Sequence, residues 1–143
     1  QAVFSWAAPM QDAIEAVIHW LGALVAAPLP EGDLKSLVVD GVFAGFLLLN
    51  LQGTFAGYIQ TVGLAPAFRG RGLGEQLLAF AEQRILRDHP NVFLCVSSFN
   101  QAARRFYARL GYEQVGELTD FLVAGHSEFL LRKTVGPIRG YRP

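Results

Sequence analysis

The residues best suited to chemistry in this sequence form the run Arg69-Gly70-Arg71-Gly72-Leu73-Gly74, which follows an apolar segment and opens a helical one. Glycine lets backbone N–H groups approach a ligand that a Cβ would block. A helix that begins here adds unpaired N–H groups and the positive end of its dipole. Arginine adds positive charge on forked donors. Together these residue types predict a site for a pyrophosphate.

The order of the glycines excludes two common phosphate-binding motifs. A Walker A loop needs Lys followed by Ser or Thr, and neither pair follows Gly74. The dinucleotide fingerprint G-x-G-x-x-G fails in both registers, because Glu75 and Leu77 stand where its last glycine belongs. The pattern present is R-x-x-G-x-G. A nucleotide-binding protein that holds another pyrophosphate in this loop stays open as an alternative.

Hydrophobic periodicity and turn residues predict the elements that position the loop. We expect strands over residues 3–6, 34–39, 42–51, 55–64, 92–97, 113–118 and 128–133, and helices over 9–26, 73–87 and from Asn100 to a stop at Gly111. Asp40-Gly41 is a hairpin signal, and the segment 55–97 reads as a parallel crossover. The order predicts an α+β fold with one central mixed sheet flanked by helices, in a single domain of residues 1–143.

Composition narrows the class of protein. Hydrophobic residues make up 52% of the chain and charged residues 17%, with zero net charge, so we expect a globular domain. The uncharged run 41–67 contains five glycines and is typical of two strands and a turn rather than of a membrane span. No secretion signal is evident, and the lone Cys95 fits a reducing cytoplasm. Because the chain begins at Gln1, we expect its N-terminal end to be incomplete or processed.

The distribution of charge is uneven along the chain. Acids dominate the first half and bases the second, so a polyanion would prefer the second half. Nucleic acid is not favoured, because the arginines lie mostly on predicted helices beside acids and no ribbon of aromatic and basic residues is present. We expect no nucleic-acid or membrane partner. The apolar run Phe43, Phe46, Leu47, Leu48 and Leu49 could be core or partly the face of a homodimer.

Two blocks of the sequence resemble the GNAT superfamily of N-acetyltransferases. Residues 62–74 are similar to the acetyl-CoA loop of that family. Residues 100–112, with Asn100, Ala103, Tyr107, Gly111 and Tyr112, are similar to its N-x-x-A-x-x-x-Y-x-x-x-G-[FY] helix. The resemblance covers about residues 34–133. It implies a mostly antiparallel GNAT fold, acetyl-CoA as co-substrate, and an amine on a small molecule or a peptide as acceptor.

The resemblance also implies roles for individual residues. Loop amides would bind the coenzyme pyrophosphate; they belong to Arg69, Gly70, Arg71, Gly72, Leu73, Gly74 and Glu75. The preceding strand would splay from its parallel neighbour and hold the thioester with Val62, Gly63 and Leu64. Gly63 suits a departure from regular pairing, and a strand amide aimed at the thioester oxygen would stabilise an oxyanion. Asn100 would contact the pantetheine arm, and its type and position also predict a helix N-cap.

Tyr107 has two interpretations. Its place on an apolar helical face is typical of a core tyrosine. The resemblance implies instead that its hydroxyl points at the coenzyme sulfur and protonates the leaving thiolate. A phenol with an ordinary pKa of about 10 is protonated at neutral pH and can do so.

The general base is open at this point. Many members of the family place a Glu near the position of Gln60, and Gln cannot act as a base. The alternatives are a carboxylate (Glu31, Asp33 or Glu128), His126, or water held by backbone groups. We interpret Cys95 as a buried apolar side chain that fills space in a strand, rather than as a nucleophile. We expect no metal site, since His19, His89 and His126 are dispersed.

The predicted function is therefore direct acetyl transfer from acetyl-CoA to an amine, without an acyl-enzyme. Holding both substrates together would supply much of the acceleration. The alternative is a non-catalytic acyl-CoA-binding or sensing module of the same fold, which Gln60 keeps open.

Overall fold

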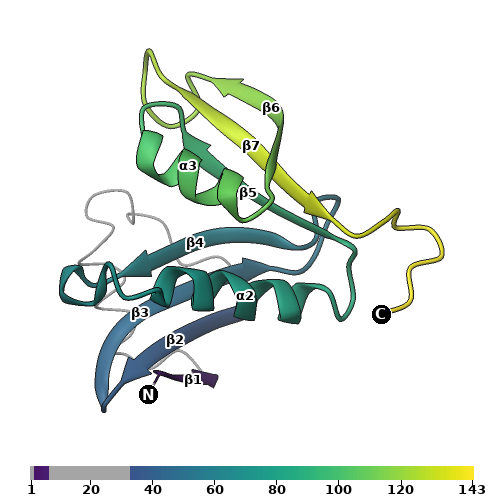
Figure 1. The fold of residues 1–143 in the computed structure, drawn as a ribbon. Helices are drawn as coiled ribbons and strands as arrows, with labels where there is room; N and C mark the ends of the chain where they lie inside the picture. Colours follow the sequence, from purple (N-terminus) through teal and green to yellow (C-terminus); the bar gives the residue numbers. More distant parts are fainter. Residues whose placement is uncertain (1, 7–32) are drawn as a thin grey trace.

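The computed structural model describes residues 2–6 and 33–143, which form one sheet with two helices (Figure 1). The described elements are, in chain order, β1 (Ala2–Trp6), β2 (Asp33–Val39), β3 (Val42–Asn50), β4 (Tyr58–Leu64), a 3₁₀ turn (Pro66–Phe68), α2 (Leu73–Ile85), β5 (Asn91–Ser97), α3 (Gln101–Arg109), β6 (Glu113–Thr119) and β7 (Ser127–Thr134). The helix predicted over 9–26 lies outside the described residues.

The seven described strands lie in the order β1-β2-β3-β4-β5-β7-β6. Every neighbouring pair is antiparallel except β4 and β5, which are parallel. The predicted α+β fold with a mixed, mostly antiparallel sheet is confirmed. The predicted hairpin between β2 and β3 is present, and Asp40 and Gly41 both have positive φ, 50° and 78°, as a type I′ turn requires.

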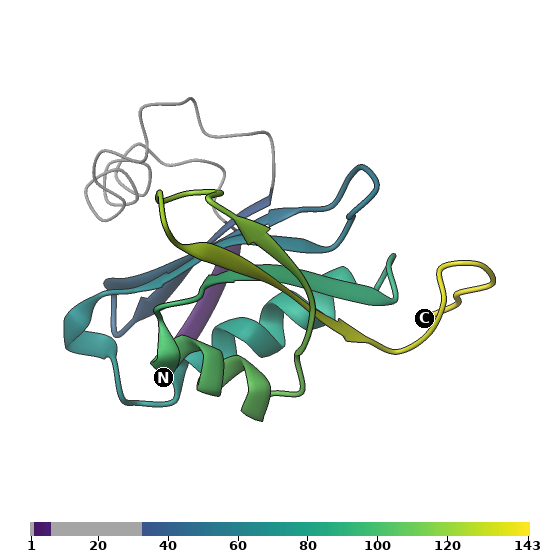
Figure 2. The same cartoon turned by 90° about the horizontal axis from the view of Figure 1, so that it is seen from above.

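Helices α2 and α3 cover the same face of the sheet (Figure 2). The core lies between them and the strands, and its buried members include Leu47, Leu49, Ile59, Leu77, Ala81, Ile85, Val92, Leu94 and Leu131. The α2 members recur at helical spacing and the β5 members alternate, which is why the sequence pattern located both elements. Phe46 to Leu49 are each at most 5% exposed. That part of the apolar run is therefore buried within the chain rather than on a dimer face.

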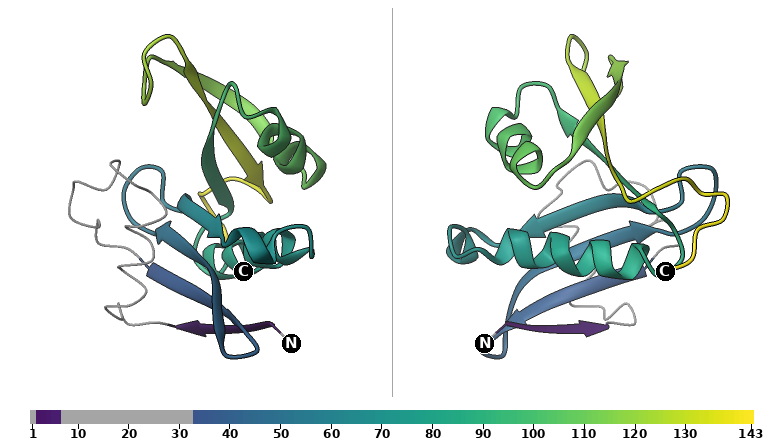
Figure 3. Two further views of the ribbon diagram at one scale, coloured as in Figure 1. Left: turned by 90° about the vertical axis from the view of Figure 1, so that its left-hand side faces the viewer. Right: turned by 45° about the vertical axis from the view of Figure 1, so that its right-hand side comes forward.

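The sheet opens between β4 and β5. Their pairing consists of one parallel pair, Tyr58 with Phe93, and the strands then diverge (Figure 3). On its other side β4 stays paired with β3 as far as Leu64. Backbone groups along one edge of β4 are therefore free of a neighbouring strand, and the predicted splay of this strand is present.

The irregularity in β4 falls at a different residue from the one expected. The register slips between Leu48 and Leu49 of β3, which pair with Thr61 and Ile59, so Gln60 is the extra residue of a β-bulge. Gly63 itself pairs regularly with Phe46. A Cβ on Gly63 would lie 2.7 Å from Cε1 of the Phe46 ring. The glycine is needed because this ring packs on the strand, and not because the pairing breaks there.

The start of β4 also differs from the prediction. The strand begins at Tyr58, and Phe55 lies in the preceding loop, where its ring packs edge-on against Phe93 with centroids 5.3 Å apart. Gly57 has a φ of 91°, and a Cβ there would meet the Asn91 carbonyl at 2.3 Å. The backbones of Gly57 and Asn91 therefore come close together, and the single β4–β5 pair, Tyr58 with Phe93, lies next to them.

Candidate coenzyme groove and active site

A groove of about 620 Å³ lies on the helix side of the opening between β4 and β5. It is lined by the end of β4, the glycine loop, the first turn of α2 and one side of α3. Its lining includes ten of the eleven residues predicted to bind the coenzyme: Val62, Gly63, Leu64, Arg69, Gly70, Gly72, Leu73, Gly74, Glu75 and Asn100. The structure thus brings together residues that the sequence places on a strand, a loop and two helices.

The glycine loop presents backbone donors to this groove. Gly70 and Gly72 have φ angles of 75° and 74°, and the positions where their Cβ atoms would stand are open. The first hydrogen bond of α2 runs from the Gln76 N–H to the Gly72 carbonyl, at 3.3 Å. No side chain of the described residues caps this end. The amides of the first turn, at Leu73, Gly74 and Glu75, are orphan donors at the positive end of the helix dipole, which is the arrangement that favours a phosphate.

The two loop arginines differ in their placement. Arg69 lines the groove, and its Nε donates to the Leu64 carbonyl at 3.3 Å. The Arg71 guanidinium lies over the Phe68 ring, 5.4 Å from the centroid, and this residue does not line the groove. Of the two, Arg69 is therefore the one placed to contact a ligand in the groove.

Asn100 caps α3, as its type predicted. Its Oδ1 accepts from the Ala103 N–H at 3.1 Å. Its side-chain nitrogen has no partner among the described residues, and the residue lines the groove. One amide can therefore cap the helix with its oxygen and donate to a ligand with its nitrogen.

Sequence reasoning missed the α3 side of the groove. Ala102, Phe106 and Arg109 line it at i, i+4 and i+7 spacing. A Cβ on Gly74 would lie 3.4 Å from the Phe106 ring, so this glycine sets how closely α2 approaches α3. Arg109 reaches across the groove to Glu75, with 3.4 Å between the guanidinium and the carboxylate. The helical spacing was the available signal. Phe106 also packs against the core, so its side chain contacts both the core and the groove.

Tyr107 is 9% exposed and belongs to the core between the helices and the sheet. It does not line the groove, although its neighbour Phe106 does. Its ring packs edge-on against Phe106 and Tyr112. Burial raises the pKa of Tyr107, so the phenol keeps its proton at neutral pH. Its hydroxyl makes no hydrogen bond to the described residues, whereas a buried hydroxyl is normally paired.

Tyr112 shows what a paired tyrosine looks like in the same core. Its hydroxyl donates to Oε1 of Glu82 at 3.0 Å, and the same carboxylate accepts from Lys133 Nζ at 3.1 Å. Burial and the Glu82 charge raise the pKa of Tyr112. This network ties α2 to β7 and the end of α3, and it needs no ligand.

Three polar side chains lie on the sheet face away from the helices. Tyr58 of β4 is hydrogen-bonded to Cys95 of β5, and Glu128 of β7 is close enough for its charge to act on both. Burial is the main cause that raises the pKa of the Cys95 thiol. Cys95 is therefore a neutral thiol rather than an activated nucleophile, and it is half-buried rather than fully buried as predicted.

The remaining predicted candidates are not gathered into a site. His89 Nε2 lies 3.2 Å from the Leu51 carbonyl, and His126 packs on the Phe99 ring with centroids 5.0 Å apart. Within residues 2–6 and 33–143, no group of three or more His, Cys, Asp or Glu side chains could hold a metal. His19 and Glu31 lie outside the described residues. No helix in the described part of the chain is long and apolar enough to cross a membrane.

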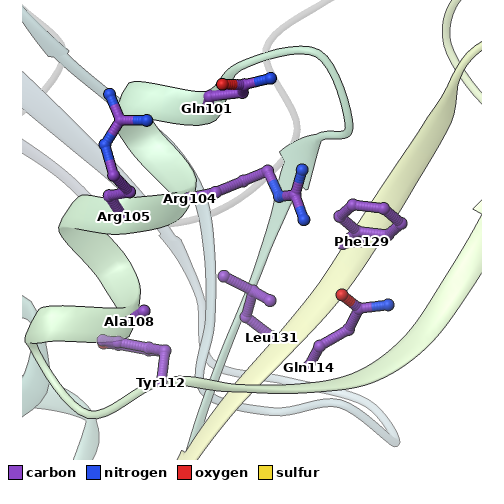
Figure 4. A pocket seen from close by; sticks show the side chains of 8 residues that line it. All are labelled: Gln101, Arg104, Arg105, Ala108, Tyr112, Gln114, Phe129 and Leu131. Carbon is purple, nitrogen blue, oxygen red and sulfur yellow. The ribbon is translucent and has the colours of Figure 1, made fainter.

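A second, smaller hollow of about 390 Å³ lies between α3 and the β6–β7 pair (Figure 4). The guanidinium of Arg104 lies over the Phe129 ring, 4.7 Å from its centroid, and donates to the Ser98 carbonyl at 3.1 Å. The hollow shares no lining residue with the groove. Gln101, the first residue of α3, lines it, but Asn100 caps that end of the helix, and no glycine is among the lining residues. The features expected of a pyrophosphate site therefore belong to the groove.

The sequence and the fold match a known class of protein. The model of the acetyltransferase (GNAT) family matches residues 4–112, and the chain therefore belongs to that family. It is similar to N-alpha-acetyltransferase RimI of Mycobacterium tuberculosis, with 32% identity over 98 residues, which are 66% of this chain and 59% of that protein. It is also similar to mycothiol acetyltransferase of Mycobacterium sp. (strain JLS), with 36% identity over 79 residues, 52% of this chain. The chain spans 59% and 26% of the lengths of these two relatives.

Solved structures show the same fold over almost the whole chain. The ribosomal-protein-S18-alanine N-acetyltransferase of Escherichia coli aligns with a TM-score of 0.74 at 16% identity, covering 99% of this chain and 100% of that one. Naa50 of Arabidopsis thaliana, in complex with the bisubstrate analogue CoA-Ac-MVNAL, aligns with a TM-score of 0.72 at 17% identity, covering 93% and 98%. The predicted membership of the GNAT family and its fold are confirmed.

Proposed function

We propose that this protein transfers an acetyl group from acetyl-CoA directly to an amine on a small molecule or a peptide, and that residues 1–143 act as one acetyltransferase domain. Family membership supports this activity. The observation that carries it is the uncapped N-terminus of α2, whose orphan amides adjoin two open glycines in one groove. Backbone donors in this arrangement suit the pyrophosphate of the coenzyme.

The coenzyme would run from the glycine loop toward the opening between β4 and β5. Amides of residues 69–75 would hold its pyrophosphate, and the Asn100 side-chain nitrogen would donate to the pantetheine arm. The free edge of β4 at Val62, Gly63 and Leu64 would hold the thioester. A strand N–H directed at the carbonyl oxygen would stabilise the negative charge that develops there.

Tyr107 is the group we propose as general acid. It is a buried phenol, its pKa is raised by burial, and its hydroxyl has no partner among the described residues. Such a group can donate a proton to a thiolate that leaves beside it. The amine nitrogen attacks the carbonyl carbon, the C–S bond breaks, and the sulfur takes the phenolic proton. The proton that nitrogen loses on forming the amide restores the phenol.

Ligand-dependent melting separates this function from other uses of a pyrophosphate loop. Coenzyme A and acetyl-CoA should raise the melting temperature, whereas ATP and NAD should raise it little, since a ligand stabilises the state that binds it. Release of free thiol over a panel of amines then separates an enzyme from a sensor. Stabilisation without thiol release from any amine would favour the sensing module. No stabilisation by the coenzyme would contradict both.

A further inference from the structure

Glu128 lies in an unusual environment for a carboxylate. It is 6% exposed, on β7, directly opposite Ser97 of β5. Its carboxylate forms no ion pair or hydrogen bond with any residue in the described ranges. An ionised group in such a place is costly unless a cation or a set of donors joins it. A charged ligand is therefore the expected partner.

The basic side chains of β7, and His126 before it, contact groups other than the Glu128 carboxylate. Arg132, on the same strand, donates to Oδ1 of Asn91 at 2.9 and 2.7 Å. Lys133 Nζ binds Glu82 on the helix side of the sheet. His126, two residues before Glu128, packs on Phe99. Among the described residues, no cation is directed at this carboxylate.

Glu128 lies on the face of the sheet opposite the coenzyme groove. Val92, Leu94 and Val96 of β5 point into the core under the helices, so Cys95 and Ser97 point to the other face. Glu128 shares that second face because it pairs with Ser97. Tyr58 of β4 reaches it too, since it is hydrogen-bonded to Cys95. Of the strands that carry these side chains, β4 and β5 border the opening that the groove meets from the helix side, and β7 lies next to β5.

Of the titratable groups facing one another here, the carboxylate is the one suited to accept a proton. Burial, and to a lesser extent the Glu128 charge, raises the pKa of both the Tyr58 phenol and the Cys95 thiol. Both are neutral near pH 7 and hold their protons. No titratable group of β6 is placed directly opposite Glu128, because its partner there is Leu118.

We propose that Glu128 binds the ammonium group of the acceptor and removes its proton, so that the natural acceptors are amines that are cationic at neutral pH. The inference rests on the proposed acetyl transfer and adds its base and its substrate class. One proton passes from the ammonium to the carboxylate, and the nitrogen lone pair that is freed attacks the acetyl carbon. The carboxylate later releases that proton to water, so the transfer yields the amide, free coenzyme A and one proton.

The experiment compares Glu128→Gln with Glu117→Gln, which removes an exposed carboxylate from β6. The probes are the most active alkylamine of the thiol-release panel, together with benzylamine, which is cationic at neutral pH, and aniline, which is not. In Glu128→Gln, kcat/KM for the cationic amines should fall about 100-fold, as for loss of a general base. Transfer to aniline and the Kd for acetyl-CoA should change less than about threefold. Because only unprotonated amine can react once the base is lost, the rate of Glu128→Gln with cationic amines should rise with pH as that fraction of the amine grows, whereas Glu117→Gln should leave all of these values unchanged.

Several outcomes would overturn the inference. They are an unchanged rate in Glu128→Gln, an equal loss for cationic and neutral amines, or a wild-type protein that acetylates aniline but no cationic amine. Should Glu128→Gln fold poorly, Glu128→Asp keeps the charge and should keep the preference for cationic amines over aniline at a reduced rate; loss of that preference in that variant would also contradict the inference. Failure of the proposed function looks different, because then the wild-type protein either is not stabilised by the coenzyme or releases no thiol with any amine.

Discussion

The two faces of the β4–β5 opening are built in different ways. On the helix side, the proposed coenzyme site consists mainly of main-chain donors contributed by consecutive residues of one loop and one helical turn. On the other side, the proposed acceptor site consists of single side chains, Tyr58, Cys95 and Glu128, from three strands distant in the sequence. A coenzyme that does not change can be held by the backbone. An acceptor that differs between relatives is better recognised by side chains, which can be exchanged without changing the fold.

The variant with the largest expected effect should impair coenzyme binding alone. Gly72→Glu would place a negative side chain at the mouth of the phosphate site, so affinity for acetyl-CoA should fall more than about 100-fold in calorimetry, beyond the worth of a single lost hydrogen bond. Gly53→Glu is the matched control, because Gly53 also has a positive φ, 85°, and open space at its Cβ position. Both variants carry a similar backbone strain of about 1–2 kcal/mol. Affinity in Gly72→Glu within a few-fold of the wild type would show that the loop does not hold the coenzyme.

The next effect concerns the chemistry between the two faces. Tyr107→Phe should lower kcat about 100-fold and leave the Kd for acetyl-CoA nearly unchanged, because the hydroxyl acts only on the leaving sulfur. Since burial raises the pKa of Tyr107, activity of the wild type that depends on this proton should persist to a pH above 10. Tyr112→Phe is the control, a neighbouring core tyrosine whose hydroxyl is already bound by Glu82. Equal kcat values for Tyr107→Phe and the wild type would remove Tyr107 from the mechanism.

The smallest effect tests whether the Tyr112 network is structural. Tyr112→Phe should lower the free energy of unfolding by about 1 kcal/mol at pH 7, through the lost hydrogen bond to Glu82. The raised pKa of Tyr112 means that the folded state holds this proton more tightly than the unfolded state, whose phenol titrates near 10.0. This stabilising contribution is complete below pH 10 and is lost as the pH rises toward the folded-state pKa.

Chemical denaturation between pH 8 and 11 measures both parts of that prediction. The wild type should lose stability with rising pH more steeply than Tyr112→Phe. Parallel curves for the two proteins would show that the Tyr112 phenol titrates alike in the folded and unfolded states.

The same contrast explains how much the sequence could predict. The glycine loop, the Asn100 cap and the Asp40-Gly41 turn were predictable because each depends on a backbone conformation that few residue types adopt. The bulge at Gln60 was not, because it depends on how β4 pairs with β3, which is a contact between two strands. Apart from Asn100, the α3 side of the groove was not predicted, since the pattern of one helix does not show which neighbour each side faces.

The sequence alone could not single out Glu128 as the candidate base. The sequence offered it as one of several carboxylates, with nothing to separate it from Asp33 or Glu31. Its burial and its register opposite Ser97 come from the pairing of β5 with β7, which is a long-range contact. A site made from one side chain on each of three strands leaves no local pattern in the chain.

The central claim is that loop and helix amides hold the coenzyme diphosphate, and NMR of backbone amides tests it most directly. On titration with coenzyme A, the amide resonances of Gly70, Gly72 and Gly74 should shift in proportion to saturation, and inorganic pyrophosphate should move the same signals. The Gly53 amide, far along the chain in the loop before β4, should stay in place. Saturable binding that leaves the three loop glycines unmoved, with shifts around Arg104 and Arg105 instead, would contradict the account.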